Sequence, residues 1–299
     1  MAEKVVECVP NFSEGRNKDV MDAIASAIKA TDDVKLLDYS GDPDHNRSVY
    51  TFVGKPEAVV KAAFNACKVA VQLIDMSKHT GEHPRMGAAD VVPFIPISNV
   101  SVQECVQLAK RLGELIGKEL FVPVYLYGYA ATRLERVDLS EIRKGQYEGF
   151  FDKIKSPQWT PDFGPSEVNV KSGVTAVGVR KPLIAFNVNL NTDDIKIARQ
   201  IARAVRNISG GLRGVKALGM KLNKSGMVQV SMNLVDYENT PIYRALELIK
   251  VEAKRYGVSV VSTEIVGLVP LKAIVDSAKY YMQLDNFDES KILETRLYE

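Results

Sequence analysis

The chain has 299 residues, of which 46% are hydrophobic and 25% are charged. This apolar content is enough for one large domain or for two domains of about 150 residues each. The 39 basic and 37 acidic residues give a formal net charge of +2, which argues against a general affinity for nucleic acid or for a membrane surface.

The three cysteines, Cys8, Cys67 and Cys105, lie far apart in apolar stretches. Because they form no CxxC pair, we expect buried, reduced thiols rather than a disulfide framework or a zinc site. The N-terminal residues lack the long apolar stretch of a secretory signal. The apolar stretch Val91–Ile97 is too short to span a bilayer. These features predict a cytoplasmic protein.

The first half of the chain alternates between predicted strands and helices. Asn17 suits the N-cap of a helix whose apolar face is formed by Val20, Ile24 and Ile28. Pro56 suits the first turn of a second, longer helix. We expect strands at 5–10, 34–40, 49–54, 91–97 and 122–127, and a third helix near 102–116.

Residues 153–173 contain three prolines and two glycines and show no periodicity. We interpret this segment as a connector between two halves, with a loop that covers a ligand site as the alternative. The second half then alternates again, although we find no convincing sequence repeat. Its expected strands are 174–179, 183–190, 215–222, 227–234 and 258–266, and its expected helices are 194–206, 241–256 and one that begins at Pro270.

The mixture of antiparallel strand pairs and helices predicts an α+β fold of ferredoxin-like layers rather than a doubly wound parallel sheet. Two of the expected strands carry amides along one face. Asn187 and Asn189 alternate with apolar residues in one strand, and Gln229, Ser231 and Asn233 do so in another. Asparagine is uncommon in strands, so these faces are either ligand-binding surfaces or solvent-exposed sides of a sheet.

The chain has three histidines, His45, His79 and His83. His79 and His83 match the H-x-x-E-H string of some zinc peptidases, in which residues four apart on one helix bind the metal. Gly81 and Pro84 disfavour that helix, so we favour His83 as a single general base in a rigid loop and predict no metal site. A surface or structural histidine is the alternative.

Four cationic side chains are candidates for binding a carboxylate, each with a solvated charge as the alternative. They are Arg47, Arg85, Lys181 and Arg213.

Eight motifs follow one another along almost the whole chain: Val6–Gly15, Asn46–Gly54, Leu73–Ser77, Gly81–Gly87, Val122–Gly128, Pro161–Ser166, Ala185–Asn189 and Val266–Lys272. In this order they resemble the formiminotransferase domain of the formiminotransferase-cyclodeaminases, in the stand-alone form known as glutamate formiminotransferase. The resemblance implies transfer of the formimino group from N-formimino-L-glutamate to N5 of tetrahydrofolate, giving 5-formiminotetrahydrofolate and L-glutamate. Tetrahydrofolate would be a co-substrate in histidine degradation and one-carbon metabolism, no metal would be needed, and the protein would be a homodimer.

The resemblance also implies where the ligands bind. It implies two α/β-sandwich subdomains, residues 1–178 and 179–299, with a folate tunnel between them, and it implies that His83 is catalytic. The implied folate-binding residues are Gly164, Pro165, Ser166, Glu167, Val168, Asn169, Val170, Lys171, Ser172 and Gly173. The substrate-binding candidates are Asn11, Arg47, Arg85, Asn187, Asn189 and Asn233.

The chain departs from the family at Ser40, near which the animal members carry an acidic residue. Asp42 or Asp44 is a candidate to replace that carboxylate. Because the chain ends at Glu299, we expect no cyclodeaminase activity. The alternatives for the function are a glutamate formyltransferase that uses 5-formyltetrahydrofolate, a folate-binding protein without catalysis, and a zinc hydrolase.

Overall fold

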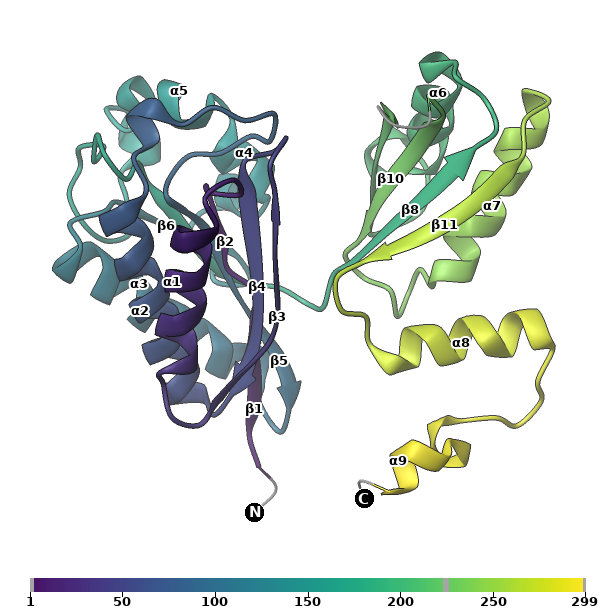
Figure 1. Cartoon of the computed structure of the whole chain (residues 1–299), viewed down its shortest axis with the longest axis horizontal. Helices are drawn as coiled ribbons and strands as arrows, with labels where there is room; N and C mark the ends of the chain where they lie inside the picture. Colours follow the sequence, from purple (N-terminus) through teal and green to yellow (C-terminus); the bar gives the residue numbers. More distant parts are fainter. Residues whose placement is uncertain (1–2, 223–225, 298–299) are drawn as a thin grey trace. The chain divides into compact units, whose positions relative to one another are not determined.

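The computed structural model describes residues 3–222 and 226–297. The chain forms two compact units, Met1–Arg180 and Lys181–Glu299 (Figure 1). Each unit has its own sheet and its own cluster of buried apolar side chains. Each unit therefore folds around an interior of its own.

A mixed sheet forms the centre of the first unit. Its strands are β1 (Val5–Cys8), β2 (Asn11–Phe12), β3 (Val34–Asp42), β4 (Arg47–Gly54), β5 (Ala89–Ser98), β6 (Val124–Gly128) and β7 (Thr175–Val179). In the sheet, β3 pairs with β4, β4 with β1 and β2, and these two with β5, all antiparallel. The strands β5, β7 and β6 then pair parallel, in that order. Both β1 and β2 lie between β4 and β5, so together they act as one strand that is interrupted before Asn11.

Three long helices cover one face of this sheet: α1 (Lys18–Lys29), α2 (Pro56–Leu73) and α3 (Val102–Glu119) (Figure 1). The predicted N-cap of α1 is confirmed, because the Asn17 side chain accepts hydrogen bonds from two backbone N–H groups of the first turn. The prediction that Pro56 begins α2 is also confirmed. Two short helices, α4 (Leu139–Arg143) and α5 (Gln146–Lys153), bring Ile142 and Phe150 to a smaller apolar cluster with Tyr125.

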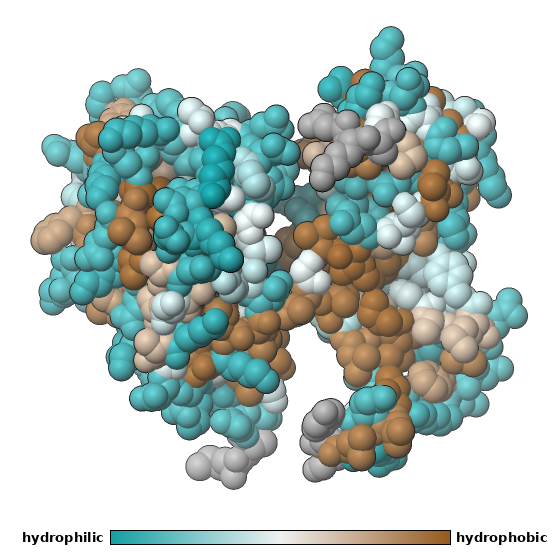
Figure 2. All heavy atoms as spheres, viewed as in Figure 1, coloured by the Kyte–Doolittle hydropathy of each residue, from teal (hydrophilic) through white to brown (hydrophobic). Residues whose placement is uncertain are grey.

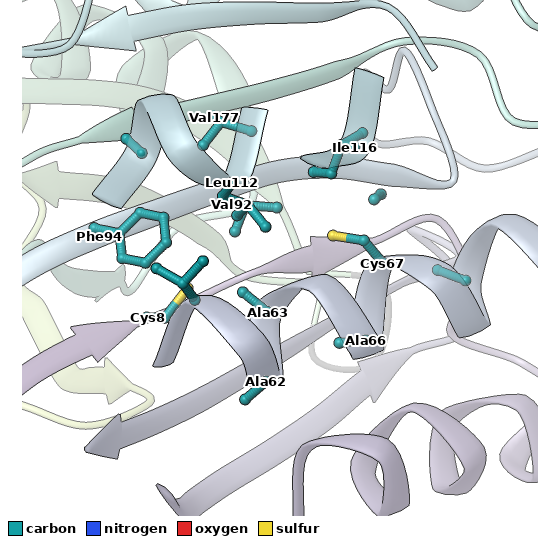
Figure 3. Close-up of a cluster of buried hydrophobic side chains, with 14 of the residues drawn as sticks. Cys8, Ala62, Ala63, Ala66, Cys67, Val92, Phe94, Leu112, Ile116 and Val177 are labelled. Atoms are coloured by element: carbon teal, nitrogen blue, oxygen red, sulfur yellow. The ribbon is translucent and has the colours of Figure 1, made fainter. Parts of the chain in front are cut away.

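The largest apolar cluster lies between the sheet and these long helices. Figure 3 shows side chains from α2, α3 and β5 meeting around Cys8 and Cys67. The three cysteines are buried and free, as predicted. Burial raises the pKa of the Cys67 thiol to about 12, so this cysteine acts as a small apolar residue rather than a nucleophile.

The interpretation of residues 153–173 as a connector between the halves is wrong. The segment runs from α5 to β7 inside the first unit. The carbonyl oxygen of Phe163 accepts a hydrogen bond of 2.9 Å from the backbone N–H of Val124. Gly164 lies against Gly117 of α3, and a Cβ added at Gly117 would be 2.5 Å from the backbone nitrogen of Gly164. Packing against α3 therefore orders a segment that has no secondary-structure periodicity.

The second unit contains an antiparallel sheet in the order β11-β8-β10-β9. Its strands are β8 (Ile184–Leu190), β9 (Val215–Lys221), β10 (Val228–Leu234) and β11 (Val260–Val266). Helices α6 (Ile195–Val205) and α7 (Ile242–Arg255) contact the sheet and each other, and α8 (Leu271–Met282) and α9 (Leu293–Leu297) follow β11. The predicted α+β class with mixed and antiparallel sheets is confirmed.

The two units share an order of elements, β-α-β-β-α-β. In the first unit this run is β1/β2, α1, β3, β4, α2 and β5, and in the second it is β8, α6, β9, β10, α7 and β11.

Among the described residues, no helix has the length and apolarity needed to cross a membrane.

Candidate active site

A buried carboxylate in the first unit holds two arginines. Asp90, on β5, is 0% exposed. Its Oδ2 accepts a hydrogen bond of 2.8 Å from Nη1 of Arg47 and one of 2.6 Å from Nη2 of Arg143. Its Oδ1 accepts a hydrogen bond of 2.9 Å from the backbone N–H of Met86. One negative charge therefore lies between two positive ones, which leaves the cluster with a net positive charge.

Asn11 orients the first of these arginines. Its Oδ1 accepts hydrogen bonds of 3.1 Å from Nε and 2.7 Å from Nη2 of Arg47. Phe12 points into the core under the helices, so the alternation of a strand places Asn11 on the opposite face of the sheet. Nε of Arg143 is buried and has no hydrogen-bond partner among the described residues. Arg143 is therefore a donor suited to an anionic ligand.

His83 lies next to this cluster, half-buried in the loop between α2 and β5. Its Nδ1 is 2.6 Å from the carbonyl oxygen of Pro84 and 3.1 Å from Nη1 of Arg47. A carbonyl oxygen can only accept, and its contact with Nδ1 is the shorter of the two, so the geometry favours a proton on Nδ1. This tautomer leaves the lone pair of His83 on Nε2, where it can act as a base.

The arginines also affect the charge of the histidine. Burial, followed by the positive charges of Arg47 and Arg143, lowers the pKa of His83 to about 3, with Asp90 opposing the shift. His83 is therefore a neutral and weak base at physiological pH.

We expect this shift to be visible in the pH dependence of the reaction. A lowered pKa means that His83 is in its base form at every pH above about 3. The value of kcat/KM, which reports groups of the free enzyme, should therefore show no acidic limb from an imidazole between about pH 5.5 and 7. The His83 imidazole signals in NMR spectra, assigned with a His83→Gln variant, should not titrate in this range, and titration near pH 6.5 would contradict the expectation.

Arg85 and His79 hold the loop that carries His83. All five N–H groups of Arg85 have partners: Nδ1 and the carbonyl oxygen of His79, the side chain of Gln146, and both carboxylate oxygens of Glu148. His79 is buried, and its Nε2 lies 3.0 Å from the carbonyl oxygen of Asn46. Both ring nitrogens of His79 thus contact the protein itself.

The predicted folate segment, Gly164–Gly173, lies in two environments. At its start, Gly164 has a φ of +84° and approaches the backbone of α3. At its end, Gly173 has a φ of +70°, and a Cβ there would be 2.2 Å from the carbonyl oxygen of Met86. The end of this segment therefore packs beside the chain that follows His83, and only glycine fits that close approach.

The asparagines of the second unit form part of a polar sheet face. Asn189 accepts a hydrogen bond of 2.9 Å from Gln229 and donates one of 3.0 Å to Ser262. Asn187 donates one of 3.3 Å to Glu264. The alternate residues of these strands pack with α6 and α7, so the amides lie on the face that these helices leave uncovered. Asn233 is exposed on β10.

The structure therefore brings Asn11, Arg47 and His83 together, but the guanidinium of Arg85 faces Glu148 instead. Lys181 contacts Asp236 and Glu238 within the second unit. Sequence reasoning missed Asp90 and Arg143. Asp90 had a recognisable signal, because it is a single acidic residue in the apolar stretch that becomes β5.

Comparison with known proteins adds a second kind of evidence. Residues 5–180 match the model of the formiminotransferase domain, N-terminal subdomain, and residues 185–296 match that of the formiminotransferase domain. The chain belongs to the formiminotransferase family. It is 50% identical to a glutamate formimidoyltransferase from Streptococcus pyogenes serotype M1, with 98% of this chain and 99% of the relative aligned.

Two further relatives differ from each other in length. A glutamate formimidoyltransferase from Thermoplasma acidophilum is 53% identical, with 98% of this chain and 97% of that protein aligned. A formimidoyltransferase-cyclodeaminase from Mus musculus is 49% identical over 93% of this chain, but the match spans only 52% of that longer protein. The match is therefore to a whole stand-alone transferase and to half of the fused protein.

Proposed function

We propose that this protein is a glutamate formimidoyltransferase that moves the formimino group of N-formimino-L-glutamate to N5 of tetrahydrofolate. The observation that carries the proposal is identity of about half over nearly the full length of two proteins with that name. A neutral imidazole beside a cationic cluster supplies a base and an anion-binding group in one place.

In the proposed mechanism, the glutamate carboxylates bind at Arg47 and Arg143. Nε2 of His83 faces N5 of the folate as it attacks the formimino carbon, and it removes the N5 proton from the adduct. N5 is a ring nitrogen attached to an sp² carbon of the pterin, which makes the proton of the positively charged adduct acidic, so a weak base is sufficient. Bound carboxylates offset the arginine charges and raise the pKa of His83 toward neutrality.

We propose that Asn187, Asn189 and Asn233 line the folate side of a tunnel between two ferredoxin-like subdomains, residues 1–178 and 179–299. The β-α-β-β-α-β order and the β11-β8-β10-β9 strand order support the ferredoxin-like assignment. The polar sheet face of the second unit supports the tunnel. Gly164–Gly173 is proposed to bind folate, supported by the packing of its end beside the His83 loop. We also propose that Arg85 binds substrate, because it lies in the same loop as His83.

We further propose a cytoplasmic homodimer that needs no metal. Both ring nitrogens of His79 are engaged by protein groups, which argues against a role as a zinc ligand. Apolar side chains are exposed on and around α8 and α9, and Figure 2 shows apolar surface in this part of the second unit. They suit a subunit contact and are Val266, Leu268, Leu271, Ile274, Tyr280, Tyr281, Met282, Leu293 and Leu297.

A direct assay tests the proposal. The purified protein is mixed with formiminoglutamate and tetrahydrofolate, and the absorbance of the folate product and the released glutamate are both measured. Parallel reactions use 5-formyltetrahydrofolate with glutamate, and protein treated with a chelator. We expect formimino transfer that survives the chelator. A higher kcat/KM for formyl transfer, folate binding without glutamate release, or loss of transfer with the chelator would each contradict the corresponding part of the proposal.

A further inference from the structure

A second imidazole lies beside His83. His45 is on the turn between β3 and β4, and its ring packs edge to face against that of His83, with the centroids 6.1 Å apart. Nδ1 of His45 is 2.8 Å from Oδ2 of Asp42. In the part of the chain that the structure describes, no residue is hydrogen-bonded to Nε2 of His45. This nitrogen is therefore the one available to a ligand.

Asp42 fixes the turn as well as the ring. Its Oδ1 accepts hydrogen bonds of 2.9 Å from the backbone N–H groups of both Asp44 and His45, while Oδ2 contacts the imidazole. Burial opposes ionisation of Asp42, but these hydrogen bonds and the contact with His45 outweigh it and lower the pKa of the carboxyl group. The carboxylate charge of Asp42 therefore lies directly against the His45 ring.

The two histidine loops are held against each other. Asn46 donates a hydrogen bond of 2.9 Å to the carbonyl oxygen of Thr80, and its own carbonyl oxygen lies 3.0 Å from Nε2 of His79. At Gly81 an added Cβ would be 2.4 Å from the carbonyl oxygen of His45. The backbones of the two loops are thus in contact, so the two rings keep a defined relative position.

We propose that His45 is a second catalytic residue, which donates a proton to the departing glutamate nitrogen while His83 takes one from N5. This assignment rests on the function proposed above. The charge around the two rings differs in sign: His83 faces Arg47 and Arg143, whereas His45 faces Asp42. Such opposite environments divide the roles of base and acid between two groups.

The step balances in atoms and electrons. The N5 lone pair forms a bond to the formimino carbon, and the C=N π pair moves to the terminal imino nitrogen. His83 takes the proton from N5, and the imidazolium of His45 gives one to the glutamate nitrogen. The C–N bond to glutamate then breaks as the remaining amino lone pair forms the new C=N bond. Transfer of a proton from His83 to His45 through solvent restores both residues.

Two nitrogens of the adduct need opposite proton transfers, and one fixed ring does not serve both equally well. The N5 proton is acidic and needs only a weak base, whereas an alkylamine leaves readily only after it is protonated. Nδ1 is held in each histidine, by Pro84 in His83 and by Asp42 in His45. Each ring therefore presents one nitrogen, Nε2, to the substrates.

Replacement of His45 tests the assignment. We expect kcat of His45→Gln and His45→Ala to fall by about 10- to 100-fold, with KM for tetrahydrofolate changed by less than about threefold. Added imidazole should restore part of the rate of His45→Ala but not of His45→Gln, which leaves no space for it. Asp42→Asn keeps one of the two oxygen acceptors and loses the charge beside the ring, so its kcat should fall less than that of His45→Gln.

Asp32→Asn is the matched control, because this exposed side chain lies just before β3, at the opposite end of that strand from His45. Its kcat should equal that of the unchanged protein. A His45→Gln variant with kcat within about twofold of the unchanged protein would overturn the assignment. A loss in His45→Ala that imidazole does not restore would also overturn it, because His45 would then only position the loop. Absence of transfer in the unchanged protein would instead overturn the proposed function.

Discussion

Replacing His83 with glutamine is expected to lower kcat by about 10²–10⁴-fold, which corresponds to about 3–5 kcal/mol of transition-state stabilisation. Glutamine is close to histidine in size and keeps an amide N–H donor. It cannot take a proton from N5 at neutral pH. The measurement is kcat at saturating concentrations of both substrates, together with the Kd for tetrahydrofolate from calorimetry.

Glu82→Gln provides the control for this experiment. Glu82 is the exposed neighbour of His83, and its replacement should leave kcat and the Kd unchanged. If His83→Gln and Glu82→Gln had similar kcat values, His83 would not be the base. If His83→Gln lost folate binding to the same extent as turnover, the residue would instead belong to the binding surface.

Replacing Asp90 with asparagine is expected to destabilise the first unit by about 3–5 kcal/mol, because two largely buried arginines lose the charge that neutralises them. For a unit of this size the melting temperature should fall by about 6–20 °C. Differential scanning calorimetry at neutral pH measures the change. Asp152→Asn is the matched control, because Asp152 forms an exposed ion pair with Lys155 and its replacement should leave the melting temperature unchanged.

The effect of Asp90 should also depend on pH. Arg143 and Arg47, with the hydrogen bonds to its oxygens, outweigh burial and hold the pKa of Asp90 below its usual value. A carboxylate with a lowered pKa stabilises the folded state fully above the unfolded pKa of about 3.9, and this stabilisation is lost as the pH falls through the folded pKa. The difference between the unchanged protein and Asp90→Asn should therefore shrink under acidic conditions. A difference that is the same at pH 7 and well below 4 would contradict the ion-pair explanation.

Local signals in the sequence predicted most of the secondary structure. Asn17 and Pro56 marked the starts of two helices because capping depends on neighbouring residues alone. Alternating apolar residues predicted β8 and β10 to within one residue, since the apolar side chains of each strand share one buried face. Residues 153–173 were misinterpreted because glycine and proline remove periodicity. Their order comes from contact with α3, which the local sequence does not reveal.

The candidate site was predictable only in part. Family resemblance and an unusual loop pointed to His83, and a cation at the start of a strand pointed to Arg47. Arg143 comes from a five-residue helix and reaches Asp90 across 53 positions of the chain. Such a contact depends on how β5 and α4 pack, so no pattern of neighbouring residues predicts it. The pairing of His45 with His83 was missed for the same reason.

Arg85 has a consequence for how substrates are bound. Its guanidinium joins the loop before β5 to α5, through Glu148 and Gln146, and to His79. A half-exposed loop with glycine and proline would otherwise sample many conformations, and ordering it on binding would weaken affinity. These hydrogen bonds form when the protein folds. The loop therefore loses its conformational entropy on folding, and not when the substrates bind. The imidazole of His83 is thus carried by a loop that is preorganised by an arginine, and this arginine need not touch the substrate.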